Sequence, residues 1–143
     1  LHRFILHHQV MRWQTDDKVA VKIVEETKKR FPDLAVVSWD KGAHSQQNQL
    51  ELKELLDLVV LPKKGRLTEA ERQRESSPEF KLLRRKHSAV ETAINALEVH
   101  GLDQCLDHGI HGFERYVVLA VVAKNIHRLG TRPSRTGKTT AAL

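Results

Sequence analysis

The amino-terminal part of the chain alternates between strand-like and helix-like hydrophobic periodicity, and this order constrains the fold most. Residues 3–11 alternate as a β-strand requires, residues 34–39 are nearly all apolar, and residues 57–61 form a third short apolar run. The two segments between them have helical patterns, and Thr15 and Ser45 can cap them. Because a helix connects successive strands, the sequence predicts an α/β layer of parallel strands with right-handed crossovers.

The rest of the chain is helical in pattern, apart from one polar segment. Residues 62–79 are highly charged and have a proline near each end, which predicts a surface insertion with at most one short helix. Apolar residues then recur at spacings of three and four over residues 80–97, which predicts one continuous helix. A last helix is expected over residues 112–129, and the tail, residues 131–143, is expected to be disordered.

Composition excludes several classes of protein. Hydrophobic residues make up 40% of the 143 residues, which is enough for one ordinary core and excludes disorder of the whole chain. The longest apolar run, Tyr116 to Ala123, is far shorter than the about 20 residues of a membrane-spanning helix. A single cysteine, Cys105, excludes an internal disulfide framework and fits a reducing cytoplasm. The net charge of +6 favours a polyanionic partner, although a solvated basic surface explains it too.

Asp40 is the first candidate functional residue, because it directly follows the expected strand at residues 34–39 and precedes a Lys-Gly turn. Open α/β sheets place their functional sites at the carboxyl ends of strands. An aspartate in this position can equally accept hydrogen bonds from the turn amides of Gly42 or Ala43. Position alone does not decide between these two roles.

Glu91 is the second candidate, at the edge of the apolar stripe over residues 80–97. Ser88 and Glu91 have the spacing of a capping box, which would require a helix that begins at Ser88. The stripe instead continues through this region, which favours an interior position for Ser88. A carboxylate at the edge of the stripe could reach the end of a neighbouring strand, and two or three carboxylates suit Mg²⁺ or Mn²⁺.

Two other patterns resemble binding motifs but have the wrong spacing. Residues 136–140 (Thr-Gly-Lys-Thr-Thr) lack the first glycine of a phosphate-binding loop. The set His100, Cys105, His108 and His111 does not have the paired spacing of a structural zinc site. Neither pattern is expected to bind a ligand.

Several segments share the pattern of one known family. They are residues 38–45 (Ser-Trp-Asp-Lys-Gly-Ala-His-Ser), 59–67, 87–98 and 100–103, with the shorter pieces 115–117 and 123–125. Together they resemble the carboxyl half of an insertion-sequence transposase of the ISNCY type. The resemblance implies an α/β, ribonuclease H-like fold with a mixed sheet flanked by helices. Residues 1–130 would be a partial catalytic domain that lacks one or more amino-terminal strands.

Transposases of this type hold two divalent metal ions, Mg²⁺ or Mn²⁺, with an Asp-Asp-Glu triad. The resemblance assigns Asp40 as the second aspartate and Glu91 as the glutamate, each catalytic and metal-binding. The first aspartate would lie upstream of Leu1, because Asp16 and Asp17 fall in the first turn of a helix, where the helix dipole accounts for them. The implied reaction is attack by water, then by a 3′-hydroxyl, on DNA phosphodiesters. Without the first aspartate, this chain is expected to cleave DNA poorly or not at all.

The implied partner is double-stranded DNA, both as transposon ends and as target. The expected DNA-binding residues are Lys63, Lys64 and Arg66 after the third strand, and Arg84, Arg85 and His87 on the long helix. A solvated charged face explains these residues equally well. The alternative function is an inactive transposase remnant that only binds DNA through its basic surface. We expect the protein to be located in the bacterial or archaeal cytoplasm, associated with the nucleoid, and to have no membrane partner. The resemblance leaves open whether the protein forms a homo-oligomer.

Overall fold

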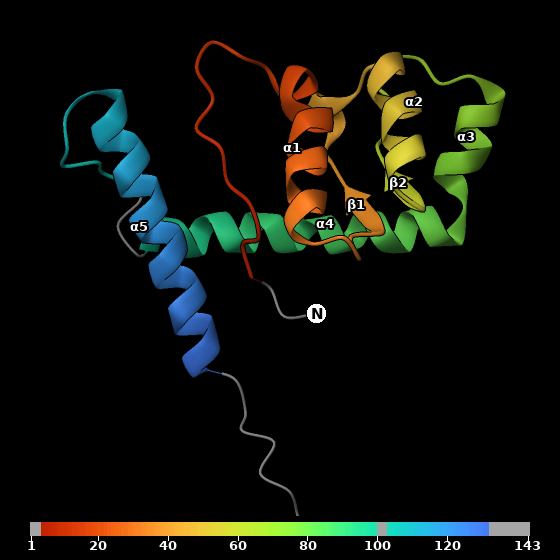
Figure 1. Ribbon diagram of the computed structural model, residues 1–143. Coiled ribbons are helices and arrows are strands. Elements are labelled where there is room, and N and C mark those ends of the chain that lie inside the picture. Colours follow the sequence, from red (N-terminus) through yellow and green to blue (C-terminus); the bar gives the residue numbers. More distant parts are fainter. Residues whose placement is uncertain (1–3, 100–102, 132–143) are drawn as a thin grey trace, which may run out of the picture. The chain divides into compact units, whose positions relative to one another are not determined.

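The computed structural model describes residues 4–99 and 103–131 (Figure 1). The chain divides into two compact units, Leu6–Ala96 and the combination of Leu1–Ile5 with Leu97–Leu143. In chain order the elements are α1 (Asp16–Arg30), β1 (Val36–Ser38), the short 3₁₀ helix η1 (Lys41–Ala43), α2 (Gln46–Leu55), β2 (Leu58–Val60), α3 (Glu69–Ser76), α4 (Pro78–Leu97) and α5 (Gly109–Gly130). The described chain is therefore mixed α/β and mostly helical.

The first two helices begin where their sequence signals predict. Helix α1 follows Thr15, but the Thr15 hydroxyl donates to the Asp17 carboxylate and accepts no hydrogen bond from the helix. Helix α2 follows Ser45, whose Oγ accepts a hydrogen bond of 3.0 Å from the backbone N–H of Asn48. The Ser45 cap is confirmed, whereas at α1 an acidic first turn takes the place of a hydroxyl cap.

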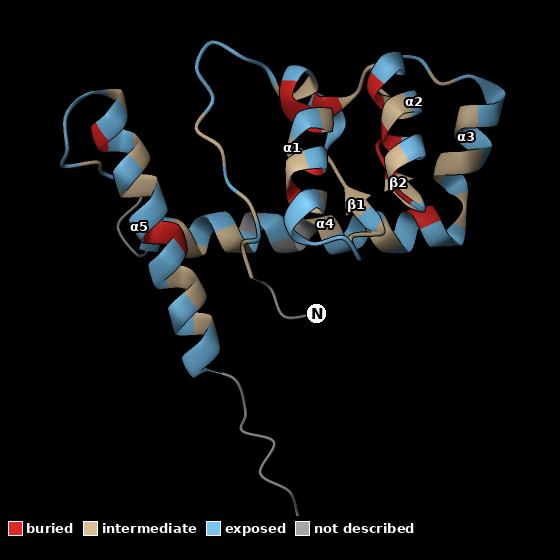
Figure 2. Ribbon diagram, viewed as in Figure 1, coloured by how far each residue is buried: buried red, intermediate tan, exposed pale blue. Residues whose placement is uncertain are grey.

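Strands β1 and β2 pair in parallel, as the alternation of strands and helices predicts, with Val37 opposite Val59. Both valines pack against a core that α1, α2 and the segment after each strand supply. Its buried members are Ala20, Val24, Ala43, Leu52, Leu56 and Leu61. Figure 2 shows buried positions on α1, α2 and β2. The packing places the carboxyl ends of both strands and the amino-terminal end of α1 in one region of this unit.

A strand is expected over residues 3–11, but the described part of this segment, residues 4–11, is neither strand nor helix. Alternating periodicity yields a strand only where a second strand supplies backbone hydrogen bonds. Within the second unit, the Asn125 side chain instead pairs with the backbone of Ile5. It accepts from the Ile5 N–H at 2.9 Å and donates to the Ile5 carbonyl at 2.9 Å.

The polar segment and the long helix after it largely match expectation. Residues 62–79 include the short helix α3, although Pro62 is fully buried beside the end of β2. Helix α4 runs without a break through Ser88, so the capping-box interpretation of Ser88 and Glu91 is wrong. A capping box does occur, but at Thr68 and Glu71, where α3 begins.

Helix α5 begins three residues before its expected start and ends at Gly130. On this helix Ala120 is buried, whereas the apolar side chain of Ile126 is 62% exposed. The tail expected to be disordered lies outside the described residues from position 132 onward. Throughout the described ranges, every helix is too short or too polar to cross a bilayer.

Candidate functional site

Asp40 lies at the carboxyl end of β1, where it is the N-cap residue of η1. Its Oδ1 accepts a 2.8 Å hydrogen bond from the backbone N–H of Gly42. The turn-bonding role considered for this residue is therefore confirmed. The residue is exposed, and the hydrogen bond leaves its second carboxylate oxygen available for another ligand.

Asp16, in the first turn of α1, also approaches this turn. A Cβ atom placed on Gly42 would lie 2.8 Å from Asp16 Oδ2 and 3.0 Å from Asp40 Oδ1. Both carboxylates thus converge on one backbone position that has no side chain. Sequence reasoning set Asp16 aside as a dipole-stabilising residue. The available signal was topological: a helix that leads into a strand and packs beside it runs antiparallel to that strand, so the start of α1 lies near the end of β1.

Asn48, in the first turn of α2, connects the elements that carry these two aspartates. Its Nδ2 donates to the carbonyl oxygen of Asp17 at 2.7 Å and to that of Ala43 at 2.8 Å. Only 7% of the Asn48 surface is exposed. One buried amide therefore holds the start of α1 against η1.

Helix α4 contacts the last residue of β1. The Nδ1 atom of His87 lies 3.2 Å from the carbonyl oxygen of Ser38, two residues before Asp40. The ring therefore donates to a strand-end carbonyl, a role that the DNA-binding expectation for His87 did not include. Glu91 lies one helical turn after His87, and its side chain is outside the described part of the structure.

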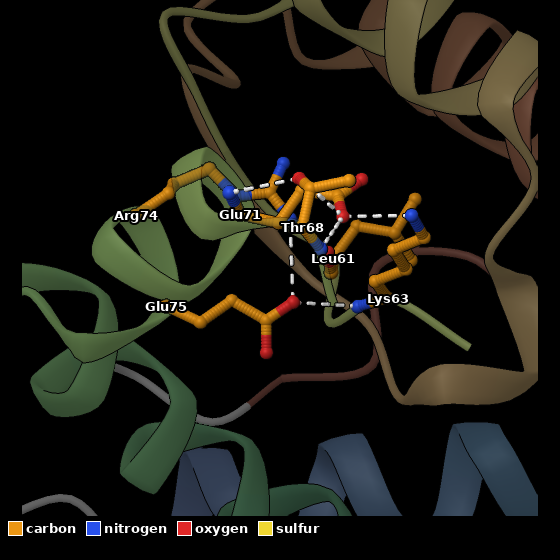
Figure 3. Close-up of polar contacts among 6 residues, drawn as sticks. All are labelled: Leu61, Lys63, Thr68, Glu71, Arg74 and Glu75. Carbon is orange, nitrogen blue, oxygen red and sulfur yellow. Dashed lines mark hydrogen bonds and ion pairs between the residues drawn. The ribbon is translucent and has the colours of Figure 1, made fainter. Parts of the chain in front are cut away.

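Lys63 is held by the glutamates of α3, as Figure 3 shows. Its Nζ forms a 2.7 Å ion pair with Glu71 Oε2, and its backbone N–H donates to Glu75 Oε1 at 2.7 Å. The hydrogen bonds from Lys63 and Thr68 lower the pKa of Glu71 to about 2. Lys63 thus attaches α3 to the segment after β2, and a DNA phosphate would have to compete with Glu71 for its ammonium group.

The other expected DNA-binding residues are exposed. Lys64 and Arg66 lie in the loop after β2, and Arg84 and Arg85 lie on α4. The pKa of Asp17 is lowered chiefly by the hydrogen bond from Thr15, with smaller contributions from Lys18 and Lys64.

A cleft of about 500 Å³ lies between α2 and α3. Its walls carry the cations Lys53, Lys63 and Arg74 together with the carboxylate of Glu71. Sequence reasoning did not single out Lys53 or Arg74, because they belong to separate helices that only folding brings together. Within the cleft, Lys63 is paired with Glu71, and Arg74 is paired with Glu75.

The described side chains include no group of three or more His, Cys, Asp or Glu residues arranged to hold a metal ion. Asp16 and Asp40 supply two hard oxygen donors, the type that Mg²⁺ and Mn²⁺ prefer. A third ligand would have to come from elsewhere, and Glu91 is the sequence-predicted source. Comparison with protein-family models, curated proteins and solved structures found no match to this chain.

Proposed function

We propose that this chain is part of the catalytic domain of an Asp-Asp-Glu DNA transposase. The observation that supports this most directly is the contact between His87 and Ser38. Asp40 follows Ser38 by two residues, and Glu91 follows His87 by one helical turn, so the contact brings the two segments that carry them to one strand end. A strand-end aspartate and a helix-borne glutamate in this order suit a two-metal site for phosphodiester chemistry.

We also propose that β1 and β2 belong to a larger, ribonuclease H-like sheet. On the edge of β1 that faces β2, the N–H of Trp39 donates to the Val60 carbonyl, and the Ala35 carbonyl accepts a hydrogen bond from the N–H of Leu58. The backbone N–H and C=O groups of successive residues point to opposite edges of a strand. The backbone groups of Val36 therefore point to the edge of β1 that faces away from β2. Val36 is 44% exposed. Further strands at this edge would complete the sheet and supply the first aspartate.

The carboxylates beside Gly42 fit a divalent cation in part. Asp40 keeps one oxygen outside its turn hydrogen bond, and Asp16 adds a second carboxylate beside it. When bound, Mg²⁺ or Mn²⁺ would activate the attacking oxygen and stabilise the leaving oxygen of a DNA phosphodiester. In this proposal Asp40 and Glu91 bind the cation.

Mn²⁺ titration of the chain tests the metal-binding part of the proposal. We expect Asp40→Asn and Glu91→Gln each to weaken Mn²⁺ affinity at least about tenfold, a loss of about 1.4 kcal/mol. Asp33→Asn, in the exposed loop before β1, is the matched control and should leave affinity unchanged. Bound Mn²⁺ should also broaden the amide resonances of Gly42 and Glu91. Absence of Mn²⁺ binding, or equal weakening by the control, would contradict the proposal.

The second candidate function is DNA binding without catalysis, and the exposed cations Lys64, Arg66 and Arg84 favour it. Each phosphate contact that is lost should reduce the slope of log K against log salt concentration by about 1. We expect this for Lys64→Ala and Arg84→Ala on duplex DNA, and no change for Lys29→Ala at the exposed end of α1. DNA binding that ignores both Mg²⁺ and Asp40→Asn would favour the non-catalytic function over the transposase.

A further inference from the structure

We propose that helix α3 is an autoinhibitory strap, whose glutamates keep Lys63 from binding a DNA phosphate. The inference deepens the second candidate function, DNA binding, and rests on it. Glu71 and Glu75 of α3 both bind Lys63, which belongs to the segment after β2 (Figure 3). In this proposal a duplex gains Lys63 as a phosphate contact only when α3 separates from that segment.

Polar contacts hold α3 in place. The structure describes all eight residues of this helix, and none of them is buried. Lys63 contacts Glu71 through its ammonium group and Glu75 through its backbone N–H, each at 2.7 Å. Arg74 of α3 adds a 3.4 Å hydrogen bond to the Leu61 carbonyl oxygen. Because α3 contributes no buried side chain to the core, it belongs to the class of segments that open locally while the rest of a domain stays folded.

Arg74 is incompletely paired at this attachment. One terminal nitrogen of its guanidinium donates to Leu61 and lies 3.4 Å from Glu75 Oε1. Its Nε atom is buried and has no hydrogen-bond partner among the described residues. A buried donor without a partner destabilises the state that contains it. The attached state of α3 is therefore less stable than its ion pairs alone would make it.

Lys63 is the first of three cations that follow β2 in the sequence. Lys64 and Arg66 are exposed, whereas the Lys63 side chain is 24% exposed and paired with Glu71. Carboxylates and phosphates both accept charge-assisted hydrogen bonds from lysine, so a phosphate can replace Glu71 at this ammonium group. A duplex bound at Lys64 and Arg66 would raise the local concentration of phosphates beside Lys63, which favours that replacement.

The first experiment compares two double variants that have the same net charge. Glu71→Gln with Glu75→Gln neutralises the glutamates that hold Lys63, and glutamine keeps an acceptor oxygen at both positions. Glu54→Gln with Glu79→Gln neutralises two exposed glutamates that form no ion pair within the described part of the chain. A difference in DNA affinity between these variants therefore cannot come from net charge.

DNA affinity and its salt dependence are measured on one duplex for both double variants. We expect the strap variant, Glu71→Gln with Glu75→Gln, to bind at least about fivefold more tightly than the charge-matched control, because a neutral acceptor holds Lys63 less strongly. Its slope of log K against log salt concentration should be steeper by about 1, because one more phosphate contact forms. Adding Lys63→Ala to the strap variant should abolish both gains.

The second experiment follows amide hydrogen exchange in the wild-type chain with and without saturating duplex DNA. An isolated helix as short as α3 is marginal in water, so its release should speed exchange of its amides. We expect DNA to speed exchange in α3 and to leave α2 unchanged. If the strap variant does not fold, Glu71→Gln alone replaces it, because glutamine also suits a capping box, and Glu54→Gln becomes its control.

The outcomes separate the strap from DNA binding itself. Equal DNA affinity of the two double variants would overturn the inference, as would DNA that slows exchange in α3 or leaves it unchanged. Either result would leave the DNA-binding function standing, because the duplex is bound in both. If neither the wild-type chain nor any variant binds the duplex, the DNA-binding function and the inference are both wrong.

Discussion

Asp16 and Asp40 direct their carboxylates to the same backbone position, Gly42, from two different elements of the fold. Like charges this close repel each other, and Asp40 offsets part of that cost through its hydrogen bond from the Gly42 amide. The pair lies at the carboxyl end of β1, where α/β sheets carry their functional sites. The arrangement therefore makes Gly42 a sensitive position for testing the site.

Gly42→Ala should disturb the carboxylate pair with little loss of stability. The new Cβ would lie 2.8 Å from Asp16 Oδ2, but this atom ends a flexible side chain and can rotate away. We expect urea unfolding to show a loss of at most about 1 kcal/mol, at the low end of overpacking costs. Mn²⁺ affinity should fall in the same variant. Gly130→Ala, whose Cβ would meet no atom within 4 Å, is the control for both measurements.

Gly112→Ala should cost more, because its neighbour cannot rotate freely. The new Cβ would lie 2.6 Å from Asp107 Cγ, and Asp107 accepts hydrogen bonds of 2.8 Å from His108 N–H and from Arg115. We expect a loss of about 2 to 3 kcal/mol in urea unfolding. Adding Asp107→Ala to this variant should recover part of the loss. A Gly112→Ala chain as stable as wild type would show that the start of α5 adjusts at no cost.

The Lys63–Glu71 ion pair predicts a specific dependence of stability on pH. Because the pKa of Glu71 is about 2 in the folded chain and near 4.5 in the absence of its partners, its contribution is complete above pH 4.5. Stability should then fall as the pH decreases from 4.5 towards 2. In acid titrations followed by circular dichroism, Glu71→Gln should flatten this part of the profile. Glu69→Gln, at an exposed position on the same helix, should leave the profile unchanged.

Asn125→Ala should release the amino-terminal segment from α5. The variant removes both hydrogen bonds to Ile5. A hydrogen bond of this kind typically contributes about 1 kcal/mol to the free energy of unfolding. We expect the Ile5 amide to exchange its hydrogen faster with solvent, while amides in the middle of α5 keep their protection. Asn95→Ala, at an exposed position on α4, is the control. Unchanged exchange at Ile5 would mean that other contacts hold this segment.

Local patterns in the sequence were sufficient to predict most of the elements and their order. Helices α1, α2, α4 and α5 and strands β1 and β2 all lie within the segments whose periodicity indicated them, to within a few residues. Their caps and apolar stripes depend on residues three or four positions apart, which a single sequence displays directly. The parallel pairing of the strands followed from the helix between them.

Contacts between residues far apart in the chain were not predictable in the same way. The strand pattern of residues 4–11 was present, but no strand pairs with it, and an asparagine side chain binds Ile5 instead. Asp16 had a sufficient local explanation in the helix dipole, so nothing in its neighbourhood indicated its approach to Asp40.

Periodicity and caps therefore specify which segments become helices or strands, because they express short-range hydrogen bonding and the burial of one face. They do not specify which polar groups meet when those segments pack. The convergence of Asp16 and Asp40, the two hydrogen bonds of Asn48 and the pairing of Lys63 with Glu71 each join separate elements. Such contacts form only when packing brings groups from separate elements close together. The geometry of the candidate site depends on these contacts.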